Sequence, residues 1–327
     1  MDLMIRTVAF VVVAACTIVM GFAIQRGATC TVAAVHELVE QRGTTRLRAL
    51  VEASVWVTAG LLVASRLGWL AVTPSGFAST GWTVVGAVLL GLGAFFNGAC
   101  VFGAIARFGS GEWAYMATPL GFYLGCLTVV RVFAPAPARA LTDDSIVFAA
   151  PDALVWLVLA VLTARIVAPM VKHRSRVRDL VTRHLWSAHA ATTVIGITFV
   201  VTLVLAGAWS YTDALADIAR GMTHNLAVRG LLLASLLIGA LIGGWTAGLF
   251  KHTRISAAGL ARCLVGGMLM GWGSMLIPGG NDGLILVGMP LLWPYAWVAF
   301  GTMYVTIGCA LVFRRRWIDQ SAGVPAP

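Results

Sequence analysis

The sequence predicts an all-α polytopic membrane protein with about nine transmembrane helices, short re-entrant half-helices and an inverted internal repeat. Composition is the first observation, since 59% of the 327 residues are apolar and 11% are charged, against roughly 25% charged in a soluble domain. The second is a series of apolar segments long enough to cross a bilayer. The third is a nine-residue pattern that occurs twice and runs into a polar, glycine-containing break each time.

Nine apolar segments have membrane-spanning length. We expect one integral membrane domain over residues 1–327, with a first repeat at about 7–131, a pivot helix at about 152–170, a second repeat at about 190–313 and a basic tail at 314–327. The first segment also has features of a signal sequence ending at a lipid-modified Cys16, but its apolar residues continue to Ile24, which favours a retained helix. The expected spans are 7–24, 49–65, 81–97, 113–130, 152–170, 190–209, 230–250, 260–277 and 293–313.

Positive charge is concentrated in alternate connections. The chain has 23 Lys plus Arg against 13 Asp plus Glu, a formal charge of +10. The positive-inside rule then predicts a periplasmic N-terminus and a cytoplasmic C-terminus. The same distribution suits contact with membrane lipid rather than with nucleic acid. The basic connections are 42–48, 172–183, 251–262 and the tail from 314, and those poor in positive charge are 66–80, 132–151 and 210–228.

Three connections are too apolar or too short to be exposed loops, yet too long to be turns. They cover 25–41, 97–109 and 278–292. Each has a polar break with glycine followed by a short apolar stretch, which is the pattern of a re-entrant half-helix. The amphipathic segment 213–224 is a fourth, weaker candidate.

The repeat supports this interpretation. VGAVLLGLG at 85–93 and VGGMLMGWG at 265–273 agree at five of nine positions. With the charge-based topology the first copy runs inward and the second outward, so the copies are inverted. Inverted repeats with broken helices are an architecture of transporters and channels.

Two cysteines lie where half-helices are expected to begin, Cys30 in QRGATC and Cys100 in NGAC. A helix N-terminus offers unpaired N–H groups and favours an anion, and a thiol adds a soft, polarizable, weakly hydrogen-bonding group. Together they suit a sulfur-containing anion better than chloride or a sugar. The alternative, that a cysteine is a small hydrophobe in the core, stays open for both and is favoured for Cys16, Cys126, Cys263 and Cys309.

The third break presents Asn281 and Asp282 in place of a thiol. If Asp282 caps its own half-helix it closes that N-terminus to anions, and the alternative is a cap at the outer water boundary. Gln25, Arg26 and Asn97 are the other polar break residues, and we include them in the candidate transport pathway.

The sequence offers no motif for catalysis or for a bound cofactor. It has no C-x-x-C pair, no glycine-rich phosphate loop and no nucleophile elbow. His36 and Glu40 have the i, i+4 spacing of metal ligands without a third ligand nearby. We therefore expect no enzyme, no catalytic residue, no cofactor and no metal site.

Three segments taken together resemble the motifs of the YeeE/YedE family of bacterial inner-membrane sulfur transport proteins. They are GFAIQRGATC at 21–30, GLGAFFNGACVFG at 91–103 and GGMLMGWGSMLIPGG at 266–280. The resemblance implies an hourglass-like pair of inverted repeats, in which thiosulfate moves inward past a line of cysteines that form transient hydrogen bonds to its sulfur. By motif position Cys30 and Cys100 are the first two of these cysteines, and the third falls at Asn281.

The resemblance therefore predicts a multi-pass transporter or channel of the bacterial inner membrane that takes up thiosulfate. Because Asn281 replaces the third cysteine, alternatives are passage assisted by the Asn281 amide, a different sulfur or selenium species, or lost transport. A further alternative is a membrane scaffold that delivers sulfur to a small cytoplasmic sulfur-carrier protein. The basic segment 172–183 would dock that carrier, or it serves only as a topology signal. An unrelated ion channel of the inverted-repeat type is the last alternative.

Overall fold

The computed structural model describes residues 2–70, 72–133, 138–142, 144–172, 185–207, 209–222 and 226–321. Most of these residues are helical, and their one β-bridge joins Phe77 and Ala140. Segment 173–184, and with it most of the expected carrier-docking connection, lies outside the described residues. The helices are α1 (Asp2–Gly27), α2 (Thr31–Gln41), α3 (Thr45–Arg66), α4 (Gly81–Asn97), α5 (Val101–Gly109), η1 (Trp113–Met116), α6 (Ala117–Thr128), η2 (Val129–Phe133), η3 (Ile146–Ala149), α7 (Asp152–Lys172), α9 (Ala188–Ala206), α10 (Tyr211–Ala219), α11 (Leu226–Thr246), α12 (Ala257–Leu276), α13 (Asn281–Gly283), η4 (Leu284–Gly288) and α14 (Pro294–Ser321).

Within the described residues, seven segments are long and apolar enough to span a membrane. An eighth exists if α12 and the α13–η4 segment, bent by 49° at their break, are taken as one span. The expected segment at 152–170 is helical as α7 but is not among the seven. The count of nine therefore stays a prediction. The seven are Thr7–Gln41, Thr45–Arg66, Gly81–Gly109, Trp113–Phe133, Ala188–Ala206, Leu226–Thr246 and Pro294–Trp317.

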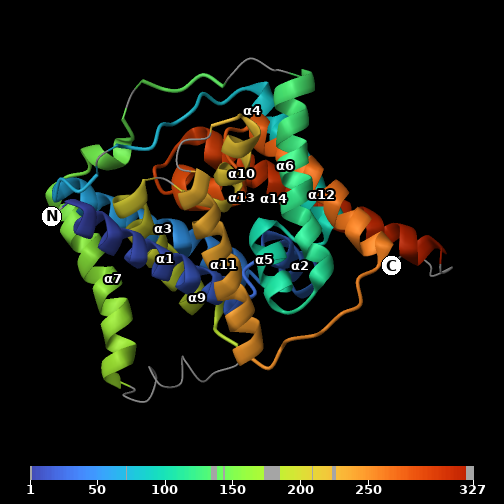
Figure 1. Cartoon of the computed structure of the whole chain (residues 1–327), viewed down its shortest axis with the longest axis horizontal. Coiled ribbons are helices and arrows are strands. Elements are labelled where there is room, and N and C mark those ends of the chain that lie inside the picture. Colours follow the sequence, from blue (N-terminus) through green and yellow to red (C-terminus); the bar gives the residue numbers. More distant parts are fainter. Residues whose placement is uncertain are drawn as a thin grey trace.

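The long helices form two groups (Figure 1). In one, α1 packs on α9 and α11 while α3 packs on α9; in the other, α12 packs on α4 and α6 while α14 packs on α4. The short elements α2, α10 and η4 each contact a helix of both groups. Helix α7 packs on α3 at the edge of the molecule. The two groups therefore enclose the short helices that follow the breaks.

Helices α4 and α12 cross where both lack side chains. A Cβ placed on Gly86 would lie 2.7 Å from the carbonyl oxygen of Gly273, and one on Gly273 would lie 2.4 Å from that of Gly86. A Cβ on Gly93 would lie 2.7 Å from the Gly266 carbonyl oxygen. Such separations are shorter than any tolerated carbon–oxygen contact, so glycine is what allows this backbone approach.

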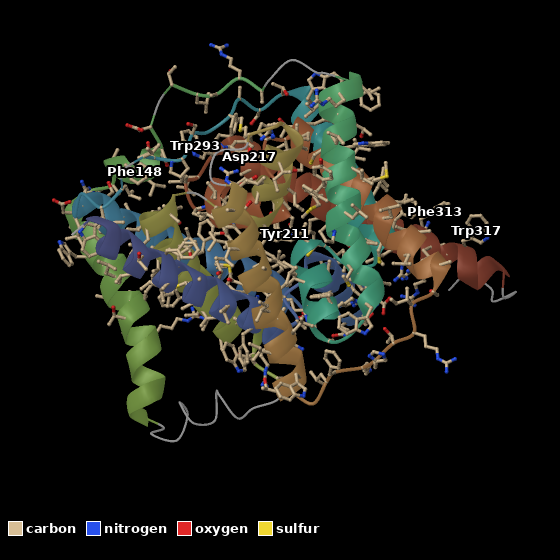
Figure 2. The ribbon with its side chains drawn as sticks, in the orientation of Figure 1. Phe148, Tyr211, Asp217, Trp293, Phe313 and Trp317 are labelled. Carbon is tan, nitrogen blue, oxygen red and sulfur yellow. The ribbon has the colours of Figure 1, made fainter. Side chains whose placement is uncertain are left out.

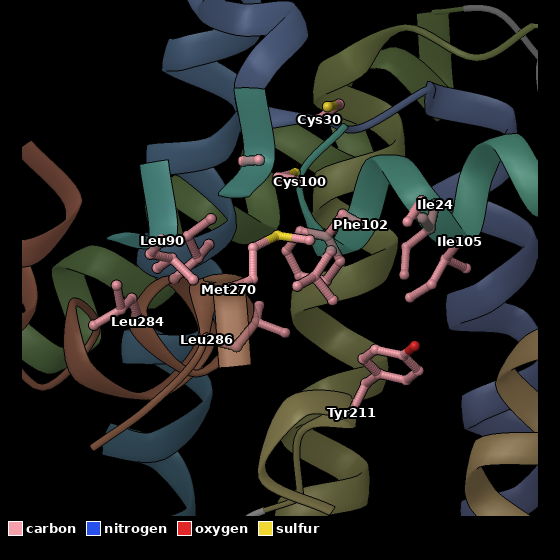
Figure 3. Packing of buried hydrophobic residues seen from close by; sticks show 14 of the residues in the cluster. Ile24, Cys30, Leu90, Cys100, Phe102, Ile105, Tyr211, Met270, Leu284 and Leu286 are labelled. Carbon is pink, nitrogen blue, oxygen red and sulfur yellow. The ribbon is translucent and has the colours of Figure 1, made fainter. Parts of the chain in front are cut away.

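One apolar core extends through both groups and the short helices between them. Figure 3 shows Leu90 of α4, Met270 of α12 and Phe102 of α5 side by side in this core. The outer surface is apolar too: Phe313 and Trp317 of α14 (Figure 2) are 67% and 64% exposed. Large exposed apolar side chains around an apolar core are expected of a protein whose solvent is lipid.

Candidate functional site

The first break separates α1 from α2 and sets the position of Cys30. Helix α1 ends at Gly27, Ala28 takes a left-handed φ of 45°, and Cys30 is the N-cap residue of α2 with extended backbone. As the sequence predicts, Cys30 stands at the mouth of a short helix. Its side chain packs against α5, since a Cβ on Gly103 would lie 2.4 Å from the Cys30 Sγ.

The second break is held by Asn97. Helix α4 ends there, Gly98 has a φ of 75°, and Cys100 is the N-cap residue of α5. The Asn97 Nδ2 donates to the Ala99 carbonyl at 2.8 Å, its Oδ1 accepts from Thr118 at 3.0 Å, and its own carbonyl accepts from the Tyr115 hydroxyl at 3.2 Å. Asn97 is thus fully buried and satisfies the polar groups that the break frees.

Three of the expected pathway residues meet around Thr31, the first residue of α2. The Thr31 N–H donates to the Cys100 Sγ at 3.1 Å, and its hydroxyl donates to the Asn281 Oδ1 at 3.3 Å. The thiols of Cys30 and Cys100 are in hydrogen-bonding contact and lie next to each other in Figure 3. The Asn281 Nδ2 is buried and has no hydrogen-bond partner among the described residues. The structure thus brings Cys30, Cys100 and Asn281 together.

Asp282 does not cap its own helix. The N-cap position of α13 is Gly280, and the Asp282 carboxylate accepts hydrogen bonds from the Thr212 N–H at 3.0 Å and from the Thr212 hydroxyl. Thr212 belongs to α10, which comes 70 residues earlier in the chain. Asp282 is only 2% exposed, so its carboxylate is not a cap at a water boundary either. It ties the beginning of α10 to α13.

Gln25 and Arg26 are directed away from this meeting point. The Gln25 Nε2 donates to the Ser110 hydroxyl at 3.3 Å at the far end of α5. The Arg26 guanidinium donates to the Thr246 hydroxyl of α11 at 2.8 Å and lies over the Phe22 ring. Both side chains are buried in the contact between α1 and its neighbours. Their inclusion in the pathway stays a prediction without support from these contacts.

Two cavities approach the meeting point from different directions. The first, about 560 Å³, is called here the arginine vestibule and is lined by Cys30, Gly98 and Gly103 together with Glu37, Tyr115 and four arginines. The second, about 730 Å³, is called the aspartate vestibule and is lined by Gly279 and Gly283, which flank Asn281, with Asp213, Asp217, Arg220 and Tyr295. Cys100, Thr31 and Asn281 are fully buried between them. The arrangement is a closed constriction with a cavity on each side.

A family profile described as "Sulphur transport" matches residues 26–311. That range holds all three breaks and both vestibules' principal walls. The chain belongs to the sulphur transport family. The family, with the seven apolar helices, identifies a multi-pass membrane protein of sulphur transport with a sulfur-containing substrate. No curated protein matches the chain.

The remaining cysteines of this sulphur transport protein lie elsewhere. Cys126 and Cys263 are buried in the core, where the Cys126 thiol contacts the Gly271 carbonyl at 3.7 Å, and Cys309 is exposed on α14. None of them lines either vestibule. His36 pairs with Glu40 at 3.1 Å, and the described residues contain no group of three or more side chains suited to a metal ion.

Sequence reasoning missed Thr31, Thr212 and the residues of the arginine vestibule that follow α5. Thr31 comes directly after Cys30, but a threonine beside a cysteine carries no motif. Arg107 and Tyr115 belong to stretches that the hydropathy pattern assigns to spans. An arginine within such a stretch was a usable signal, because a charge at membrane depth is costly unless it lines a polar cavity.

Proposed function

We propose that this protein takes up a small sulfur-containing anion, thiosulfate, across the bacterial inner membrane. The pathway leads from the aspartate vestibule through the constriction of Asn281, Cys100 and Cys30 to the arginine vestibule. One observation carries the proposal: Thr31 joins the Cys100 thiol to the Asn281 amide at the point that separates the two cavities. The family match supplies the sulfur-containing substrate class.

The chemistry of the constriction suits thiosulfate. Its N-cap cysteines lie at the positive ends of α2 and α5, which favour a negative charge. A thiol is a weak donor and a polarizable contact for the terminal sulfur. The buried Asn281 Nδ2 lacks an acceptor, and a passing oxyanion would provide one. Asn281 therefore serves where the family motif has its third cysteine.

Two inverted halves related by an offset of 180 residues are part of the proposal. Under this offset Gly86 corresponds to Gly266 and Gly93 to Gly273, and the observed contacts, 86 with 273 and 93 with 266, are the reciprocal contacts that a pseudo-twofold axis generates. The helix pairs are exchanged in the same way: α1 with α11 and α9 with α3, then α12 with α6 and α4 with α14.

The vestibules support the same relation, because several of their walls correspond. The pairs Gly103 and Gly283, Glu37 and Asp217, and Tyr115 and Tyr295 each differ by 180 residues, with one member in each cavity. An inverted pair of cavities opens to opposite sides of the membrane, which is the hourglass-like form that the sequence resemblance implies.

We assign the sides from charge. Three of the arginine vestibule's wall residues, Arg46, Arg262 and Arg314, come from the basic connections and the basic tail, so this cavity is the cytoplasmic one. The aspartate vestibule is lined by Ser75 and Ala138 of connections poor in positive charge and faces the periplasm. The N-terminus is then periplasmic and the C-terminus cytoplasmic.

Thiosulfate uptake into proteoliposomes tests the proposal. We expect Cys100→Ala to lower the initial rate by about tenfold or more, because it removes the central thiol and the acceptor of the Thr31 N–H together. Cys30→Ala lowers the rate less, since the Cys30 side chain borders the wider vestibule.

Cys309→Ala is the matched control, because Cys309 is exposed on α14 and lines neither vestibule. Its rate should equal that of the unaltered protein. Absent uptake, or uptake that neither Cys30→Ala nor Cys100→Ala changes, would falsify the thiol constriction. Complex formation with a small sulfur carrier without any flux would favour the scaffold instead.

A further inference from the structure

The arginine vestibule has an excess of positive charge that the constriction does not use. Its walls hold four arginines against the single glutamate Glu37, and the arginines come from four elements of the chain. They are Arg46 of α3, Arg107 of α5, Arg262 of α12 and Arg314 of α14. Converging guanidinium groups repel one another, so a cavity of this kind is stabilised by a bound anion.

Aromatic rings hold three of the guanidinium groups in place. The Arg107 Cζ lies 5.3 Å from the centre of the Tyr115 ring, and Arg262 donates to the hydroxyl of the same Tyr115 at 3.4 Å. The Arg314 Cζ lies 5.4 Å from the centre of the Phe95 ring. Stacked guanidinium groups keep their N–H donors available at the plane edge, which is the edge that binds oxyanions.

Counter-charges within the protein neutralise only part of this excess. Glu37 pairs with Arg46 at 3.6 Å, and Glu112 pairs with Arg107 at 3.3 Å from outside the cavity walls. The corresponding aspartate vestibule has the opposite balance, with Asp213 and Asp217 against Arg220. The two cavities share a framework but differ in charge, so the difference belongs to the side chains and not to the fold.

We propose that the arginine vestibule is a second anion-binding site, which takes tetrahedral dianions such as sulfate by charge and is separate from the thiol constriction. Arg107 and Arg262, which meet at Tyr115, form its centre, and Arg314 closes it from the opposite wall. It rests on the proposed function in one respect, that this cavity is the cytoplasmic end of the pathway.

The site and the constriction then select on different grounds. Guanidinium groups bind the oxygens of a dianion and do not distinguish sulfate from thiosulfate. The thiol constriction contacts the terminal sulfur, which sulfate lacks. Sulfate therefore occupies the vestibule without crossing the membrane, and from that side it competes with thiosulfate leaving the constriction.

Binding of inorganic sulfate to the purified protein, followed by isothermal titration calorimetry, tests the site. We expect Arg107→Gln and Arg262→Gln each to weaken sulfate binding by about tenfold, the effect of losing one charge-assisted contact. Binding to the unaltered protein should weaken as sodium chloride is raised, because the cavity is open to water. Arg314→Gln, which leaves the Tyr115 cluster intact, gives a smaller loss and serves if the other variants fold poorly.

Arg254→Gln is the matched control, an exposed arginine in the connection before α12 that lines neither cavity. It should leave sulfate affinity unchanged. Equal affinity in all four arginine variants, or equal loss in all four, overturns the site. Cys100→Ala separates the two proposals: sulfate binding that survives in this variant supports the vestibule even where uptake experiments reject the thiol constriction, and sulfate binding lost with Cys100 refutes a separate site.

Discussion

Asn281 is the residue at which this chain departs from its family's cysteine pattern, and its surroundings give that departure a chemical meaning. An amide offers both an acceptor and a donor where a thiol offers weak versions of each. The acceptor is occupied by the Thr31 hydroxyl, and the donor is buried without a partner. An unsatisfied buried donor costs about 1–3 kcal/mol, a cost that a passing anion would offset.

We therefore predict that Asn281→Ala lowers the rate of thiosulfate uptake by about tenfold, because the donor is lost, whereas Asn281→Cys retains most of the rate by restoring a thiol. The measurement is uptake of labelled thiosulfate at equal protein content in vesicles. Equal rates for Asn281→Ala and the unaltered protein would show that the amide takes no part in passage.

The residues of the breaks were predictable only where local chemistry decides them. A glycine after Asn97 and a cysteine before a short apolar stretch indicate where α4 ends and α5 begins, and the structure agrees. Gln25 and Arg26 were grouped with Cys30 because they adjoin it in sequence. They are still within α1, whose side chains turn by 100° per residue, and its last turn directs them toward α5 and α11.

At the scale of elements, the short helices owe their positions to contacts between distant segments. Asp282 in α13 accepts both polar hydrogens of Thr212 at the beginning of α10, and Thr31 of α2 reaches Cys100 and Asn281. These partners are 70 to 250 residues apart, so no periodicity or spacing in the sequence reveals them. The sequence predicted four short segments after breaks but could not predict which would be tied together.

Asp282→Ala should destabilise the protein, because it leaves the buried Thr212 N–H and hydroxyl without an acceptor. We expect a cost of about 2 kcal/mol, visible as a lower unfolding temperature in detergent, with Asp282→Asn intermediate because one oxygen remains. Asp152→Ala is the control: its ion pair with Arg66 is at the surface and contributes little. A temperature shift no larger for Asp282→Ala than for Asp152→Ala would rule out the anchoring role.

At the scale of the whole molecule, composition and charge predicted a helical, multi-pass membrane protein, because lipid demands helices whose backbone is satisfied internally. The helical elements fall close to the expected segments, with α11 beginning at Leu226 where the apolar run suggested 230. What the sequence could not supply is the grouping of the helices, since an apolar face packs equally well on many partners.

Glycine pairs at the α4–α12 crossing give a stability prediction at this scale. We expect Gly86→Ala to lower the unfolding temperature, since its methyl group would lie 2.7 Å from the Gly273 carbonyl oxygen; forcing two backbones apart costs about 1–3 kcal/mol. Gly81→Ala on the same helix meets no atom within 4 Å and should be neutral or raise the temperature slightly. Similar losses from both changes would mean that the crossing is looser than its geometry implies.

That crossing also limits how the protein can move. Helices whose carbonyl groups lie against each other's glycines cannot slide or roll past one another without meeting neighbouring side chains, so α4 and α12 behave as one rigid spine. Rocking of one half against the other is then the wrong motion to expect. Opening falls instead to the ends of α2, α5, α10 and α13, where single hydrogen bonds, not packed backbones, keep the constriction shut.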